Sequence, residues 1–163
     1  MEVGTEENRY TSKITITMHS TKYSPNLPIF GNKVIGVHYG VLEMHGLERS
    51  KTWTDLKETA AIGATSITLN DVTGDALDWQ VGEEIVIAST NFSGRDAEQR
   101  TIESITNTDT NPVITFTEPL SFKHYAARQE YGTDGDFIEM RAEVGLLTRN
   151  VKYMGDAETS PDN

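Results

Sequence analysis

The chain of 163 residues contains no cysteine. It can therefore form neither a disulfide framework nor a zinc or iron–sulfur site with cysteine ligands. No signal sequence is recognisable, and no apolar run approaches the roughly 20 residues of a membrane-spanning helix. If the protein works outside the cell, we expect this chain to be a segment of something larger.

Basic residues are scarce. The chain has 14 Lys and Arg against 25 Asp and Glu, which gives a formal net charge of -11 at pH 7. This charge repels nucleic acid and anionic membrane surfaces, so we expect neither as a partner. An acidic face could recruit Ca²⁺ or a basic partner, although a solvated surface is the commoner role. The G-x-S-x-G, P-loop and G-x-G-x-x-G motifs are also missing, which excludes simple hydrolase, NTPase and dinucleotide-binding functions.

Short strand-like segments make up most of the chain. They are rich in Ile, Val and Thr and are separated by turn residues. The segments are 13–18, 32–46, 65–70, 83–89, 112–120, 136–148 and 149–155. They predict an all-β chain with a single helix over 52–62, capped by Thr52 or Thr54 and ended by Gly63.

The segment 79–90 (WQVGEEIVIAST) shows the strand alternation best. One face takes Val81, Ile85 and Ile87, and the other takes Glu84 and Val86. This pattern predicts a half-buried strand that is entered through a tight turn at Val81 and Gly82. Trp79, just before the strand, is expected in the core.

The spacing of turns divides the chain into three blocks. In 1–50, glycines punctuate short strands as in the stacked coils of a solenoid. In 51–128, the turns are hairpin-like and predict a small closed barrel or a sandwich. Coil-like spacing returns in 129–163. The expected architecture is a parallel β-helix interrupted by a small β-barrel-like insertion.

Five segments carry a resemblance to a known family. They are 2–20 (EVGTEENRYTSKITITMHS), 27–46 (LPIFGNKVIGVHYGVLEMHG), 51–69 (KTWTDLKETAAIGATSITL), 79–90 and 140–150 (MRAEVGLLTRN). Together they resemble large cell-surface proteins that carry a G8 domain followed by a parallel β-helix. That family includes the fibrocystin-like proteins and a hyaluronan-degrading branch. The segment 2–20 resembles the end of the G8 module, so we expect 1–50 to hold the end of G8 and the first coils.

The resemblance implies a non-catalytic extracellular segment that presents a rigid β surface to a protein or glycan ligand. The implied parent is a single-pass membrane protein at the plasma membrane or the cilium. The hyaluronan-degrading branch implies an alternative, an endo-acting glycosidase, but the net charge disfavours tight binding of a polyanion unless basic residues gather on one face. Those residues would be Arg128, Arg141, Arg149 and Lys152. A third interpretation is a structural brace that shields the coils from edge-to-edge association.

Glycoside cleavage needs two carboxyl groups, one to protonate the leaving oxygen and one to act as base or nucleophile. The closely spaced pairs are Asp96 with Glu98 and Asp134 with Asp136. Arg95 and Arg100 flank the first pair, and a guanidinium can bind a sugar carboxylate. The candidate ligand-binding residues are therefore Arg95, Asp96, Glu98 and Arg100, although salt links among themselves are the commoner role. Catalytic residues stay unassigned.

Asp134 and Asp136 are also candidate Ca²⁺ ligands, because this ion prefers oxygen atoms around a glycine turn. The EF-hand spacing is absent, and a plain turn before the next strand is favoured; the same holds for 71–75 (DVTGD). No cofactor other than Ca²⁺ is suggested. The histidines match no short chelating pattern, so no other metal site is expected. They are His19, His38, His45 and His124.

Asn91, Phe92 and Ser93 form a glycosylation sequon just after a predicted strand end. In a secreted protein, Asn91 would be an acceptor on a turn. Several aromatic residues could stack against a sugar, although core or rim packing is commoner. They are Trp53, Trp79, Tyr125 and Tyr131.

Overall fold

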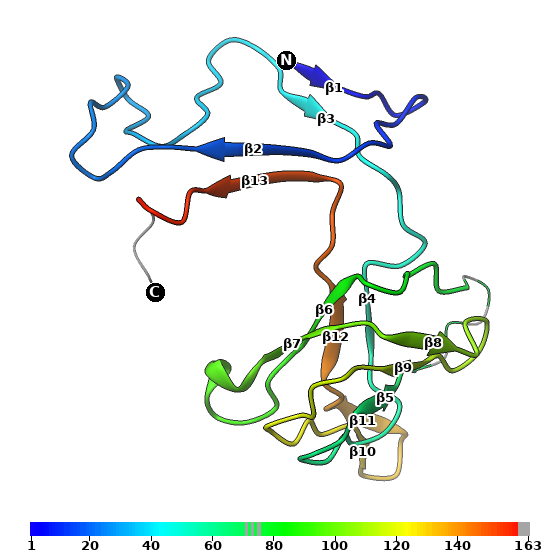
Figure 1. Cartoon of the computed structure of the whole chain (residues 1–163). Helices are drawn as coiled ribbons and strands as arrows, with labels where there is room; N and C mark the ends of the chain where they lie inside the picture. The colour runs from blue at the N-terminus through cyan, green and yellow to red at the C-terminus, as the bar shows by residue number, and fades with distance from the viewer. Residues whose placement is uncertain (71, 73, 75, 160–163) are drawn as a thin grey trace. The chain divides into compact units, whose positions relative to one another are not determined.

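The computed structural model describes residues 1–70, 72, 74 and 76–159 and separates the chain into two compact units (Figure 1). One unit combines Met1–Glu48 with Arg149–Asn163, and the other is Arg49–Thr148. Short strands dominate the described residues, with a single 3₁₀ turn, η1 (Gly94–Asp96). The prediction of an all-β chain is confirmed. Within this part of the chain, no helix is both long and apolar enough to cross a membrane.

The first unit contains two parallel strand pairs. Strand β1 (Glu2–Val3) pairs with β3 (Glu43–Met44), and β2 (Ile14–Met18) pairs with β13 (Val151–Gly155) over their full length. Figure 1 shows β2 and β13 side by side although they come from opposite ends of the chain. These pairs are short, so continuous β-helix coils stay a prediction.

Polar contacts tie the first unit together. The Asn150 side chain accepts from the amide of Leu47 at 2.9 Å and donates to the carbonyl of Tyr10 at 2.6 Å. Asp156 is buried and accepts from Lys33 at 3.0 Å, and its other oxygen lies 3.2 Å from His19. Thr159 donates to the same carboxylate. These hydrogen bonds to Thr159, Lys33 and His19 lower the pKa of Asp156 despite its burial.

The described residues of the second unit form a four-stranded and a three-stranded antiparallel sheet beside one hairpin. The four-stranded sheet has the order β4 (Trp53–Asp55), β12 (Glu143–Leu146), β6 (Glu84–Ile87) and β7 (Glu98–Thr101). The three-stranded sheet has the order β5 (Ser66–Thr68), β9 (Val113–Thr115) and β8 (Ser104–Thr106). A separate hairpin joins β10 (Arg128–Tyr131) to β11 (Asp136–Glu139).

The apolar side chains of both sheets form one core cluster in this unit. It is centred on β6 and β12, whose residues Ile85, Ile87 and Val144 are fully buried. The other members are Leu56, Ala60, Ile67, Leu69, Leu77, Trp79, Ile102, Ile114, Phe116, Leu120, Ala142 and Leu146. Removing such side chains from water is the main favourable term in folding, about 25 cal/mol per Å² of apolar surface.

The predicted closed barrel is not formed. In the described part of the chain both sheets are open, because their edge strands, β4 and β7 in one and β5 and β8 in the other, each pair with a single strand of their sheet. Barrel closure requires strands that tilt and stagger until the first meets the last. The strands here are three or four residues long, and they pack around a shared core instead.

The predicted helix over 52–62 is wrong. Residues 53–55 form β4, Leu56 bridges to Leu69, and Ala60 bridges to His124. Thr, Trp and Asp have only modest helix propensity, so tertiary strand pairing decides the conformation. The bridge places Leu56 in the core with no exposed surface.

The segment 79–90, which contains β6, behaves largely as its alternation predicts. Ile85, Ile87 and Trp79 are buried, and Gly82 lies in a turn with φ of 86°. Val81 is instead 66% exposed, because the turn interrupts the alternation before the strand begins at Glu84. Asp71 and Asp75 lie outside the described residues, so the predicted turn there is not described.

Candidate functional site

Alternation along β7 places the sequence-predicted Glu98 and Arg100 on one face of the four-stranded sheet and Gln99 on the other. Glu98 is buried, and its register partner on β6 is the buried Ile87. Gln99 is exposed and pairs with Val86, which in turn pairs with Gly145. Successive strand residues point to opposite faces, so the sheet has an inner row that contains Glu98 and an outer row that contains Gln99.

Glu98 is held by four donors. Its Oε1 accepts from the amide of Ser121 at 2.8 Å and from the Arg100 guanidinium at 2.5 Å. Its Oε2 accepts from the amide of Phe122 at 3.0 Å and from Nε2 of His124 at 2.9 Å. Both carboxylate oxygens therefore accept two hydrogen bonds, and no site remains for a proton.

His124 completes this buried cluster. Its side chain has no exposed surface, and its Nδ1 lies 2.8 Å from the carbonyl oxygen of Ala88. A carbonyl oxygen only accepts, so Nδ1 donates to Ala88, and Nε2 faces the Oε2 carboxylate oxygen of Glu98. Glu98, Arg100 and His124 thus form a buried cluster of one carboxylate, one guanidinium and one imidazole, called the Glu98 cluster below.

Two opposing effects set the pKa of Glu98. Burial acts to raise it, but hydrogen bonds from Ser121, His124, Phe122 and Arg100 act together in the other direction. The hydrogen bonds win, and the pKa falls to about 2. Glu98 is thus a permanently ionised structural carboxylate at neutral pH.

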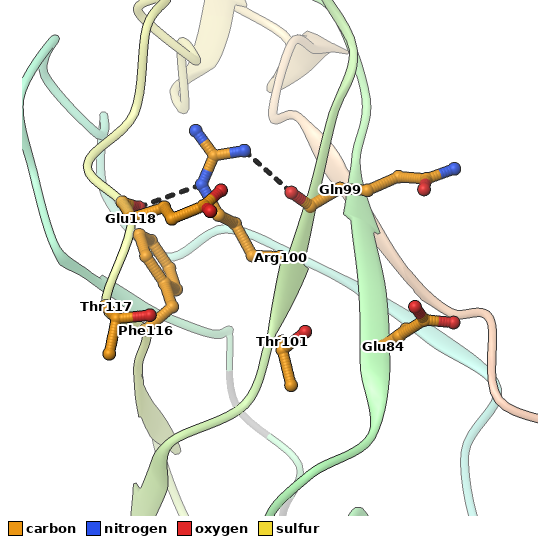
Figure 2. Close-up of a pocket in the computed structure, with 7 residues that line it drawn as sticks. All are labelled: Glu84, Gln99, Arg100, Thr101, Phe116, Thr117 and Glu118. Atoms are coloured by element: carbon orange, nitrogen blue, oxygen red, sulfur yellow. Dashed lines mark hydrogen bonds between the residues drawn. The ribbon is translucent and has the colours of Figure 1, made fainter.

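Arg100 uses most of its guanidinium N–H groups for hydrogen bonds within the protein. Besides Glu98, it donates to the main-chain carbonyls of Glu118 at 2.9 Å, Pro119 at 2.7 Å and Gln99 at 2.6 Å. Figure 2 shows two of these bonds and the recess that Arg100 borders. The recess has a volume of about 230 Å³. Its lining residues are Glu84, Gln99, Arg100, Thr101, Phe116, Thr117 and Glu118. Four of the five guanidinium donors are therefore used internally.

The outer row ends at an exposed tryptophan. Trp53 on β4 is the register partner of Gly145 on β12, and 58% of its surface is exposed. Because glycine has no side chain, the sheet surface next to the indole is flat. Trp53 also lines a recess of about 410 Å³. The other lining residues are Ser50, Lys51, Thr52, Thr54, Asp55 and Asn70.

Asp55 lies in the same recess and was not predicted from the sequence. Burial raises its pKa, and the negative charges of Glu139 and Glu143 raise it further, while Arg141 acts in the opposite direction. Glu143 is the register partner of Asp55 across β4 and β12. No local pattern could have found this group, because its carboxyl residues are far apart in the sequence.

The loop between β6 and β7 carries the remaining candidates of that region. Ser93 caps η1 by accepting from the amide of Arg95 at 3.2 Å. Asn91 is exposed and donates from Nδ2 to Asp96 at 2.8 Å. Arg95 and Asp96 thus lie on the loop surface, whereas Glu98 and Arg100 lie inside, so the four predicted ligand-binding residues do not share one surface.

A third recess, of about 520 Å³, lies beside this loop. It brings together Lys123, Tyr125 and Arg141 with Asn91 of the sequon. The full lining is Thr90, Asn91, Lys123, Tyr125, Met140 and Arg141. Two cations and an aromatic ring therefore meet at one exposed hollow of an acidic protein; we call it the Asn91 recess.

Asp134 lies in the exposed turn of the β10–β11 hairpin, and Asp136 is the exposed first residue of β11. Gly132 and Gly135 both have positive φ, as a tight turn requires. The favoured plain turn before β11 is thus observed. Among the described residues, no three His, Asp or Glu side chains converge as a metal site. Ca²⁺ binding by the hairpin stays a prediction.

Of the four basic residues considered for a polyanion groove, Arg128 and Arg141 belong to the second unit. Arg128 stacks on Phe137 at 3.5 Å from the ring centroid, and Arg141 donates to Glu139 at 2.7 Å. Arg149 and Lys152 belong to the first unit.

Residues 1–57 match the G8 domain family model. Along its length the chain is similar to fibrocystin-L of Mus musculus, with 38% identity over 157 residues, and of Homo sapiens, with 36% identity over 165 residues. These matches cover 95% and 100% of the chain. Protein rliB of Dictyostelium discoideum is 30% identical over 167 residues, or 99% of the chain.

The chain spans 4% of the length of each fibrocystin-L and 13% of protein rliB. The expected G8 sequence and the similarity to fibrocystin-like proteins are therefore confirmed. The relation to a hyaluronan-degrading branch stays a prediction.

Proposed function

We propose that the chain is a non-catalytic extracellular segment of a large, membrane-anchored cell-surface protein of the fibrocystin-like type. In this proposal it presents a rigid β surface that binds a glycan, with protein ligands as the alternative class. The observation that supports it most strongly is the similarity to fibrocystin-L over 95% to 100% of the chain. A ciliary location is part of the same proposal.

The interior of the second unit supports a scaffold rather than a catalyst. The Glu98 cluster resembles an acid–base site in composition, but each of its charged groups is occupied by a fixed partner. A catalytic carboxyl group needs access to substrate and a pKa matched to its task. Glu98 has neither, because it is 6% exposed and its pKa is about 2.

The proposed glycan surface is the outer row that ends at Trp53. An exposed indole offers a flat apolar face for a sugar ring, and its polar neighbours can bond the hydroxyl groups. Those neighbours include Thr54 and Asn70 in the same recess. Gly145 adds no side chain beside the ring, and the nearest atom to the position of an added Cβ is Cγ1 of Val86 at 3.4 Å.

The binding test compares two exposed aromatic residues. Trp53→Ala is measured against a panel of immobilised glycans that includes hyaluronan, with Tyr131→Ala as the matched control because Tyr131 is 50% exposed on β10. We expect Trp53→Ala to lose at least tenfold in affinity for the glycan bound by the native chain, and Tyr131→Ala to retain it. Equal binding by both variants would exclude the outer row as the glycan surface.

A second candidate function is glycoside cleavage, and Asp55 is the observation that favours it. A general acid in a glycosidase needs a raised pKa and a second carboxyl group nearby. Asp55 has a raised pKa and has Glu143 as its cross-strand partner. We rank this function second because the net charge of -11 opposes a polyanionic substrate.

Hyaluronan depolymerisation, with and without Ca²⁺, separates the two functions. Under the proposed function, the polymer keeps its size distribution in the presence of the native chain. Shortened polymer, with loss of cleavage in Asp55→Asn and Glu143→Gln, would establish the glycosidase instead. Surface labelling of intact cells by an antibody to the chain tests the location, and labelling only after permeabilisation would contradict it.

A further inference from the structure

We propose that the Asn91 recess is the seat of the first sugar of a glycan carried by Asn91 itself. Asn91, Phe92 and Ser93 form the sequon, and all three are exposed. Asn91 is also one of the residues that line the recess. The acceptor and the hollow are thus adjacent, and the ligand class is an N-acetylhexosamine.

The Asn91 side chain is fixed in a way that leaves room for a sugar. Its Nδ2 donates one hydrogen to Asp96 at 2.8 Å, and an amide nitrogen has two. In the modification, Nδ2 loses one proton and bonds to the anomeric carbon of a lipid-linked oligosaccharide. The bond from that carbon to the pyrophosphate oxygen breaks, and the lipid pyrophosphate leaves. The remaining N–H still donates to Asp96, so the side chain holds its direction.

The recess has the chemistry of a sugar site. Tyr125 provides an aromatic face, and the Lys123 ammonium lies 5.7 Å from the centre of its ring. Arg141 donates once to Glu139 and so keeps further N–H groups for a carbonyl or hydroxyl oxygen of the sugar. Met140 is 44% exposed and offers an apolar contact for the acetyl methyl group.

The size and rigidity of the recess also fit. Ligand pockets in proteins typically span about 300–1,000 Å³, and this recess has about 520 Å³. Thr90 joins its two sides, because its hydroxyl accepts from the amide of Tyr125 at 2.9 Å and donates to the carbonyl of Lys123 at 3.4 Å. A preformed hollow loses little entropy when it receives a tethered sugar.

The exposure of Phe92 is a further reason to expect a glycan over this part of the surface. Its side chain is fully exposed next to the acceptor. A glycan on Asn91 would shield apolar surface that otherwise faces water, which adds to the favourable contact.

The experiment compares two forms of the same sequence. The chain is made in a eukaryotic secretory host, trimmed enzymatically to a single sugar on Asn91, and compared with the unmodified chain from a bacterium. Mass spectrometry gives the occupancy at Asn91. We expect the form with one sugar to melt about 2–4 °C above the unmodified chain, as a stabilising contact does in a chain of this size. We also expect nuclear Overhauser contacts between the acetyl methyl and the Tyr125 ring.

Two variants separate docking from general effects of glycosylation. In Tyr125→Ala, the melting increment from the sugar should vanish, whereas in Tyr131→Ala on β10 it should persist. An unmodified Asn91 in the secreted, folded chain would overturn the proposal. So would an attached sugar that changes no melting temperature and makes no contact with Tyr125. The inference rests on the proposed extracellular placement, but neither result would alter the Trp53 binding test.

Discussion

Replacement of Glu98 should destabilise the second unit more than any surface change, and by an amount that depends on the substituent. Glu98→Ala removes the acceptor of four donors at once. Two of these are backbone amides, and the other two are the Arg100 guanidinium and the His124 ring. Removing one partner from a buried charge pair typically costs about 3–5 kcal/mol, because the opposite charge stays buried without compensation. We expect a loss in this range.

Glu98→Gln should cost less, because the amide can replace most of the contacts. Its oxygen can accept from Arg100 and Ser121, and its nitrogen can donate to a neutral His124 that keeps its bond to Ala88. The amide of Phe122 then loses its acceptor. One unsatisfied buried donor costs about 1–3 kcal/mol, so we expect Glu98→Gln to fall between the native chain and Glu98→Ala.

Urea unfolding of the native chain and both variants, followed by tryptophan fluorescence, measures these differences, since Trp79 reports on the core. Glu84→Gln is the matched control, because Glu84 is exposed on the neighbouring strand and should change stability by less than about 0.5 kcal/mol. A loss below about 1 kcal/mol for Glu98→Ala would refute the reasoning. It would mean that the Glu98 cluster contributes no net stability.

Three further predictions concern acid stability, backbone strain and the half-buried acid Asp55. Folding lowers the pKa of Glu98 from 4.5 to about 2. The ionised Glu98 therefore stabilises the fold fully above pH 4.5, and this contribution is lost as the pH falls from 4.5 through 2. Acid titration followed by circular dichroism should show the loss in the native chain but not in Glu98→Gln. Gly82→Val should lower the free energy of unfolding by about 1–2 kcal/mol, because a φ of 86° disfavours residues with a side chain, although no atom lies within 4 Å of the added Cβ. Gly82→Asn should cost less. An unchanged melting curve for the valine variant would contradict backbone strain as the cause. Folding raises the pKa of Asp55, so ionisation of this carboxyl group destabilises the fold as the pH rises. Asp55→Asn should therefore raise the melting temperature at pH 7. A lower melting temperature would show that the ionised carboxylate has a stabilising partner.

Local alternation predicted the parts of the fold that depend on neighbours in sequence. It placed Ile85, Ile87 and Trp79 in the core correctly, because a strand with one buried face must alternate. It failed for 52–62, where the partner strands lie elsewhere in the chain. Trp53 pairs with Gly145, and no signal within the segment announces that partner.

The Glu98 cluster was only half visible in the sequence. Glu98 and Arg100 were named among four candidate residues, and salt links among those four on an exposed turn were the favoured interpretation; the structure has the Glu98–Arg100 link, but inside the protein. Their burial was missed, although Ile102 continues the same alternation and is 1% exposed. Reading that alternation back from Ile102 would have placed both charges inside. The contact of His124 with Glu98 could not be predicted from the sequence, because the two residues meet only through the tertiary conformation of the segment 119–124.

The Glu98 cluster also stabilises the shape of the Asn91 recess. Besides their contacts with Glu98, His124 and Arg100 also bind main-chain carbonyls, those of Ala88 and Pro119 respectively. These contacts fasten the end of β6 to the segment 118–124. The Asn91 recess is built from the residues that directly follow on both sides, with Thr90 and Asn91 after β6 and Tyr125 after His124. A buried charge cluster is thus the anchor of a surface hollow, and loss of Glu98 should disorder the recess before it unfolds the rest of the core.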